Sequence, residues 1–324
     1  MYLFDEEAGQ FEFNDIHDPA YRQIFIDVIH DLHANFHGET AEKLRNLYFN
    51  LELHKDSLSK IKNRNWHIKG KGFRELAQMD VKEATPLIQK FINVKNPILR
   101  IDAQVAMVKL SGQNPLDFLE KINYELSYWE QINIYNTLVY HQINVDSFEP
   151  LLSNPNSSVV AFAVRMIGLF KHVQSADKVK QLLNDDCPDV RLAAVKTIGA
   201  FENPIYTDAL KALFLKETKI ISVMKTDKEK PKKANCHQLL TLDDLAHRKI
   251  RHAILEVMHA IASTEDIPFL KAIVLDAKNS IRIRTNALSI LNTIPTEGKA
   301  ILDKLRANED EQLIRIINVI TENQ

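Results

Sequence analysis

The chain repeats itself every 31 residues. Residues 158–170 (SVVAFAVRMIGLF) and residues 189–201 (DVRLAAVKTIGAF) share Val, Ala, Val, Ile, Gly and Phe at identical places. The same frame returns at residues 99–103, 283–287 and 314–318, whereas residues 216–245 depart from it. A unit this short cannot bury an apolar face alone. The repeat therefore predicts a stack of similar units, in which each unit packs against its neighbours.

Each unit has the pattern of two helices, and the second helix carries the shared motif. At 3.6 residues per turn, Val190, Ala194 and Ile198 lie on one face of that helix. Pro97 and Pro188 stand where second helices begin, a position at which no backbone N–H is needed. Only 8 glycines occur in 324 residues, too few for an all-β fold with many tight turns. The pattern therefore predicts an all-α fold, a solenoid of helical hairpins.

Residues 187–194 (CPDVRLAA) resemble the motif of the HEAT-repeat family in its shorter bacterial form, and the resemblance extends over about residues 64–322. It implies a right-handed α-solenoid, an α-α superhelix whose second helices line a concave groove. In that family an arginine joins a ladder with acids of neighbouring repeats. The resemblance implies this structural role for a recurring basic column, which consists of Lys69, Arg100, Arg191, Arg251, Arg284 and Arg315.

Two parts of the chain do not follow the repeat. Residues 1–13 are predicted to be a flexible acidic N-terminus, and residues 14–63 a helical cap over the first repeat. The cap contains two predicted amphipathic helices, at 19–37 and 39–55. The apolar face of the first is predicted to consist of Phe25, Val28, Ile29, Leu32 and Phe36. Residues 225–241 form a basic insert in the solenoid, and its stretch KTDKEKPKK is predicted to be a solvated loop.

Charge and cysteine content narrow the class of protein. Lysine and arginine number 41 and aspartate and glutamate 43, a net charge of −2, which argues against a strongly basic nucleic-acid binder. Two cysteines make no disulfide framework, so a reducing compartment is predicted. No signal peptide and no run of 18 apolar residues is recognisable. We expect a cytoplasmic monomer; the alternative is the soluble part of a membrane-anchored or peripherally associated protein.

Three histidines of the first predicted helix form a candidate metal site. His30, His33 and His37 lie within about 60° of one another on a helix. A solvent-exposed histidine face is the favoured interpretation, and no cofactor is predicted. A second group of cysteine and histidine between residues 236 and 259 lacks paired C-x-x-C spacing. HEAT-like di-iron hydroxylases carry repeated His-Glu pairs, whereas this sequence has no His-Glu dipeptide.

The function predicted from the sequence is a non-catalytic scaffold that binds a protein or peptide; nucleic acid is not expected as a partner. Both tryptophans are interpreted as core or inter-repeat packing groups. Two alternatives stay open: a metal-dependent or lyase-type HEAT-like enzyme, and an adaptor that uses the Lys225–Lys233 stretch at an anionic lipid or nucleic-acid surface. The predicted groove residues are the polar side chains of second helices that point away from the core, namely Lys71, Arg74, Asp102, Asn133, Asn136, Arg165, Lys196, Glu256 and Asn286.

Overall fold

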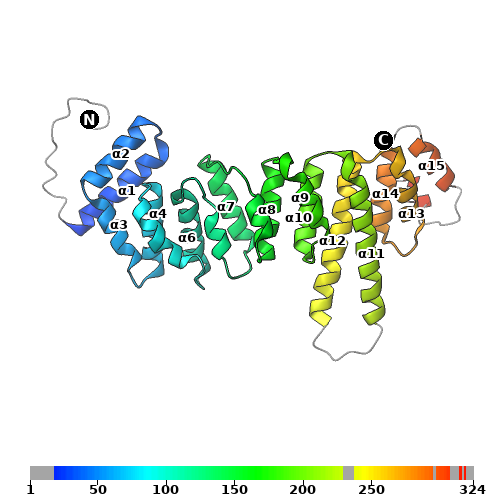
Figure 1. Cartoon of the computed structure of the whole chain (residues 1–324), viewed down its shortest axis with the longest axis horizontal. Coiled ribbons are helices and arrows are strands. Elements are labelled where there is room, and N and C mark those ends of the chain that lie inside the picture. The colour runs from blue at the N-terminus through cyan, green and yellow to red at the C-terminus, as the bar shows by residue number, and fades with distance from the viewer. Residues whose placement is uncertain (1–17, 229–236, 295–296, 307–313, 316, 319–324) are drawn as a thin grey trace. The chain divides into compact units, whose positions relative to one another are not determined.

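The computed structural model describes residues 18–228, 237–294, 297–306, 314–315 and 317–318. All regular elements in these ranges are helices, which confirms the predicted all-α solenoid class (Figure 1). The chain divides into two compact units, residues 1–146 and residues 147–324. None of the described helices is both long and apolar enough to cross a membrane.

The first unit is built from seven α-helices among its described residues, joined by short 3₁₀ turns. Helix α4 packs against α3 on one side and α6 on the other, and α7 packs against α6. The bounds are α1 Pro19–Asn35, α2 Glu39–Asn50, α3 Leu53–Ile61, α4 Trp66–Gln78, α5 Thr85–Ile88, α6 Pro97–Leu110 and α7 Tyr128–Tyr140. The second helices of the repeat are thus α4, α6 and α7, and much of each first helix is reduced to 3₁₀ turns.

The second unit continues the same scheme. Helix α10 packs against α8 and α12, and α12 packs against α11 and α14. The bounds are α8 Ser157–Leu169, α9 Ala176–Gln181, α10 Pro188–Ala200, α11 Thr207–Lys228, α12 His237–Ile261, α13 Ile267–Leu275, α14 Ile281–Thr293 and α15 Glu297–Arg306. Helices α11 and α12 are the longest of this unit, with 22 and 25 residues, and extend beyond their neighbours (Figure 1).

The repeated residues form the core of the second unit. Val190, Ala194 and Ile198 are fully buried, as the sequence predicts. The recurring glycines allow the second helices to approach closely. A Cβ atom on Gly168 would lie 2.8 Å from Thr197 Oγ1, and one on Gly199 would lie 2.5 Å from Val257 Cγ2. The glycines of the motif are therefore required by helix packing.

The N-terminal helices differ from the prediction. The structure buries Ile26 and Ile29 of α1, whereas Val28 and Phe36 are exposed, because α1 packs against both α2 and α4. The helix predicted over 39–55 is broken at Glu52, which adopts a left-handed backbone with φ 54°. The break lets α3 turn so that Leu53 and Tyr48 are both buried. Residues 1–17, which include the predicted flexible N-terminus, lie outside the described residues.

The basic insert is also more helical than predicted. Helix α11 continues to Lys228 and α12 begins at His237. Both helices therefore enter the range 225–241 that was expected to be an insert with a solvated loop. Residues 229–236 lie outside the described residues. Helices α11 and α12 pack against each other.

Candidate binding face

Two residues of the basic column hold neighbouring repeats together. Arg100 Nε donates to Glu130 Oε1 at 2.6 Å, and its Nη1 donates to the carbonyl of Val94 at 3.0 Å. Arg191 Nε donates to Glu217 Oε1 at 2.7 Å, and its Nη1 donates to the carbonyl of Asp185 at 2.8 Å. Each arginine thus binds the turn before its own helix and an acid of the following unit.

The other residues of the column have different partners. Arg251 Nη2 donates to the side-chain oxygen of Asn279, and its guanidinium stacks on Phe214. Arg284 Nε donates to the carbonyl of Val274 at 2.8 Å. Lys69 Nζ lies 5.0 Å from the centre of the Phe91 ring, and Arg315 is exposed. Each buried arginine of the column thus has at least one partner within the fold.

The predicted groove residues of the first unit lie on α4, α6 and α7. Lys71 Nζ is 2.9 Å from Asp27 Oδ1, and Arg74 Nη1 is 2.6 Å from Asp102 Oδ2. The structure therefore brings Arg74 and Asp102 together across two adjacent second helices, α4 and α6. These charges are paired on the surface, which leaves them little free energy to gain from a partner.

Two aromatic residues of α7 are far more exposed than a packing role would require. Trp129 is 63% exposed and Tyr140 is 76% exposed, so Trp129 is not a packing group of the core, and Trp66 is also partly exposed. With the predicted groove residues Asn133 and Asn136, they occupy positions i, i+4, i+7 and i+11 of one helix. These four residues therefore form one stripe, here called the α7 stripe. The spacing was present in the sequence, but nothing there shows which face of α7 is covered.

The second unit contains a hollow on the predicted face. Glu256 and Asn286 line a cavity of about 370 Å³ between α12 and α14, together with His259, Arg282 and Ser289. Arg282 and Ser289 were missed because each is a lone polar residue without a motif, and His259 was considered only as part of the loose cysteine and histidine group. Arg165 is half-buried on α8 and Lys196 is exposed on α10, and neither lines this cavity. The structure thus brings together two of the four predicted residues of this unit.

The histidines of α1 are not the exposed face that the sequence favours. His30 and His33 are half-buried, because α1 packs against α4, and His37 lies beyond the end of α1. The Nδ1 atom of His33 is 3.1 Å from Gln78 Nε2, and Lys109 Nζ donates to Gln78 Oε1 at 2.6 Å. No group of three potential His, Cys, Asp or Glu metal ligands occurs within the described part of the chain.

A small cavity of about 230 Å³ adjoins His33, and its charges are mainly positive. It is lined by His33, Arg45, Lys109 and His141, among others. Burial lowers the pKa of His33 from 6.5 to about 4, and the positive charges of Arg45 and Lys109 add to this effect. Burial also lowers the pKa of Lys109 to about 8. These surroundings oppose the binding of a metal cation at His33.

The low pKa of His33 predicts an acid-sensitive fold. Between about pH 6.5 and pH 4 the unfolded chain binds a proton at this residue while the folded chain does not, so stability falls as the pH is lowered through this window. We expect His33→Gln to remove the His33 contribution to this dependence, which is worth about 1 kcal/mol once solvent screening of a half-exposed group is considered. His30 and His141, whose pKa values are also lowered by burial, should keep their contributions. Urea unfolding of both proteins at several pH values measures the His33 contribution, and parallel curves would contradict the assignment.

Comparisons with known proteins identify one type of repeat in part of the chain. Residues 145–222 match the family model described as HEAT repeats. No curated protein matches the sequence. Human deoxyhypusine hydroxylase in complex with glycerol is similar at 11% identity and a TM-score of 0.30, over 94% of this chain and 96% of that chain.

Two further solved structures are similar at the same low level. Kap121p has 13% identity and a TM-score of 0.35, over 94% of this chain and 33% of that chain. The complex of CpcE and CpcF of phycocyanin lyase from Nostoc sp. PCC7120 has 14% identity and a TM-score of 0.28, over 84% of this chain and 94% of that chain. The repeat motif of residues 187–194 lies within the matched residues, so residues 145–222 of the chain consist of HEAT repeats.

Proposed function

We propose that this protein is a non-catalytic scaffold that binds a protein or peptide through the outward face of its second helices. The α7 stripe is the observation that carries the proposal. Trp129 and Tyr140, at its two ends, are among the most exposed large side chains of the described residues. Tryptophan and tyrosine are the residues that most often dominate the free energy of protein–protein association. Exposed aromatic groups in line with two amides fit such a contact better than they fit a solvated surface.

The chemistry of the α7 stripe also fits a protein partner. Asn133 Nδ2 donates to the carbonyl of Trp129 at 2.8 Å, which fixes the amide beside the indole. Asn136 is exposed and has a donor and an acceptor for a backbone peptide group. Aromatic anchors surrounded by polar groups are typical of the centre and rim of interfaces. The low cysteine content supports placing this scaffold in the cytoplasm, and we treat it as a monomer.

The α7 stripe predicts the effect of removing its two aromatic rings. We expect the Trp129→Ala/Tyr140→Ala double variant to lose at least about tenfold in affinity for a partner, since hot-spot truncations cost about 2 kcal/mol or more. Both side chains are exposed, so the unfolding midpoint should change little. The partner is first identified by affinity capture on the wild-type protein and mass spectrometry. Its affinity for both proteins is then measured with purified components.

The matched control is the Tyr21→Ala/Ile205→Ala double variant. It also removes two exposed apolar side chains, but from α1 and from a 3₁₀ turn before α11. It should retain the partner at wild-type affinity. Equal binding by all three proteins would refute the proposed role of the α7 stripe. Turnover of a substrate by the wild-type protein, with the partner absent, would instead support the enzymatic alternative.

A further inference from the structure

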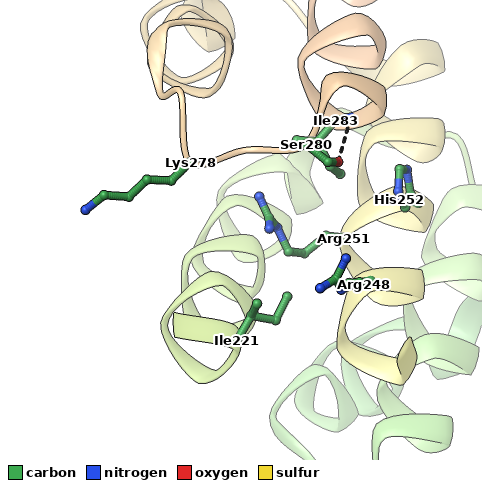
Figure 2. Close-up of a pocket in the computed structure, with 7 residues that line it drawn as sticks. All are labelled: Ile221, Arg248, Arg251, His252, Lys278, Ser280 and Ile283. Carbon is green, nitrogen blue, oxygen red and sulfur yellow. Dashed lines mark hydrogen bonds between the residues drawn. The ribbon is translucent and has the colours of Figure 1, made fainter. Parts of the chain in front are cut away.

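A positively charged cavity lies between α11, α12 and the start of α14. Its volume is about 210 Å³. Figure 2 shows Arg248 and Arg251 on one wall, and Ile221 and the segment from Lys278 to Ser280 around the same space. The remaining lining residues are His252 and Ile283, so none of the described residues that line the cavity is acidic. Such a set of side chains favours an anion.

The buried arginine of this cavity lacks the acid that two other arginines of the column have. In the basic column, Arg100 pairs with Glu130 and Arg191 pairs with Glu217. At the corresponding place Arg251 meets Asn279, a neutral amide. Arg251 is only 7% exposed, and its Nε atom has no hydrogen-bond partner. A buried guanidinium without a carboxylate is costly, and a bound anion would supply the missing negative charge.

Other groups at the cavity also favour a bound anion. Ser280 is the N-cap of α14, a helix of 13 residues, and its hydroxyl accepts from the backbone N–H of Ile283 at 3.4 Å. The N-terminus of such a helix carries a partial positive charge. The Nδ1 atom of His252 is buried without a hydrogen-bond partner. Two acids act on Arg251 from outside the lining: Asp276, and Glu217, which is already bound by Arg191 and His247.

We propose that this cavity binds the phosphate group of a small phosphate monoester. Arg251 and Arg248 contribute guanidinium groups, whose donors match phosphate oxygens. Lys278 also lines the cavity, but its ammonium is directed away from the two arginines (Figure 2). The volume of about 210 Å³ is below the 300–1,000 Å³ typical of sites for drug-sized ligands, so the site fits a phosphate and little more. The site is separate from the α7 stripe and does not depend on protein binding.

The sharpest test is the Asn279→Asp variant, which restores an acid beside Arg251. The new carboxylate would compensate the charge of Arg251 from beside the cavity, so phosphate affinity should fall by at least about tenfold. The fold should persist, because the substitution is nearly isosteric and the new ion pair with Arg251 offsets the lost hydrogen bond from Asn279 Nδ2 to the carbonyl of Ile273. Calorimetric titration with inorganic phosphate and with phosphoserine, at low ionic strength, measures binding to the wild-type protein and the variant. Thermal unfolding of both checks that the variant is folded.

A pair of lysine variants provides the control. Lys278→Ala removes an exposed cation whose ammonium is directed away from the two arginines, and should weaken both probes less than Asn279→Asp does, whereas Lys271→Ala removes an exposed lysine of α13 and should leave binding unchanged. Phosphoserine binding tighter than inorganic phosphate supports a soluble monoester. If vesicles that contain phosphatidic acid retain the wild-type protein more strongly than vesicles without it, and Asn279→Asp abolishes this retention, the phosphate belongs to a lipid headgroup. Absence of saturable phosphate binding, or equal binding by Asn279→Asp, would overturn the proposal.

Discussion

Replacement of Glu217 by alanine should destabilise the second unit by about 3–5 kcal/mol, the usual cost of removing one partner of a buried ion pair. Glu217 is fully buried on α11, and Arg191 of α10 is 3% exposed. One carboxylate oxygen of Glu217 accepts from Arg191 Nε at 2.7 Å, and the other contacts His247 Nδ1 of α12. Without the carboxylate, the guanidinium stays buried with its charge uncompensated. Urea unfolding followed by circular dichroism measures the loss.

A double variant separates the buried charge from the lost packing. Arg191→Met/Glu217→Leu removes both charges and keeps similar volumes. We expect it to lose less stability than Glu217→Ala alone, because buried pairs are often replaced by apolar residues at little cost. Some loss remains, since the carbonyls of Asp185 and Asp186 also accept from Arg191. A loss below about 1 kcal/mol in Glu217→Ala would show that water reaches the pair.

The second helices could be predicted from the sequence because their signal is local. The motif places Val190, Ala194 and Ile198 on one face, and α10 begins at Pro188 as expected. The first helices could not be predicted with the same accuracy. Around α5, for example, the chain forms 3₁₀ turns, Lys82–Ala84 and Gln89–Phe91, whose hydrogen bonds leave no periodicity that differs clearly from that of an α-helix.

The candidate sites depend on contacts between residues that are distant in the sequence, and the spacing of residue types does not reveal such contacts. His33 is half-buried because α1 packs against α4, and the residue that it meets, Gln78, is distant in the sequence. Arg251 belongs to a regular column, but its unusual partner Asn279 lies in a loop of the next unit, 28 residues away. For the exposed face of α7, the sequence did indicate part of the site, because Asn133 and Asn136 were predicted to point away from the core. Trp129 was predicted to be a core or inter-repeat packing group, because a lone tryptophan is usually buried.

Glu75 should contribute as much to the stability of the first unit as Glu217 contributes to the stability of the second. Its side chain is 3% exposed and has partners on two preceding helices. Ser57 Oγ and Lys60 Nζ of α3 both donate to Oε2 at 2.5 Å, and Gln23 Nε2 of α1 donates to Oε1 at 3.1 Å. The Tyr48 hydroxyl of α2 donates to Ser57 Oγ at 2.8 Å, so α2 joins the same network. One carboxylate on α4 therefore connects all three N-terminal helices to the first repeat.

We expect Glu75→Ala to cost about 3–5 kcal/mol, because it leaves the Lys60 ammonium and the Ser57 hydroxyl buried without their acceptor. If α1–α3 act as the predicted cap, the effect should be local. Amide hydrogen exchange should then lose protection in α1–α3, while α10 keeps its protection. Glu83→Ala is the control, since Glu83 is exposed and its loss should change the free energy of unfolding by less than about 0.5 kcal/mol. Equal loss of protection in α1–α3 and α10 would mean that the N-terminal helices unfold together with the repeats and do not form a separate cap.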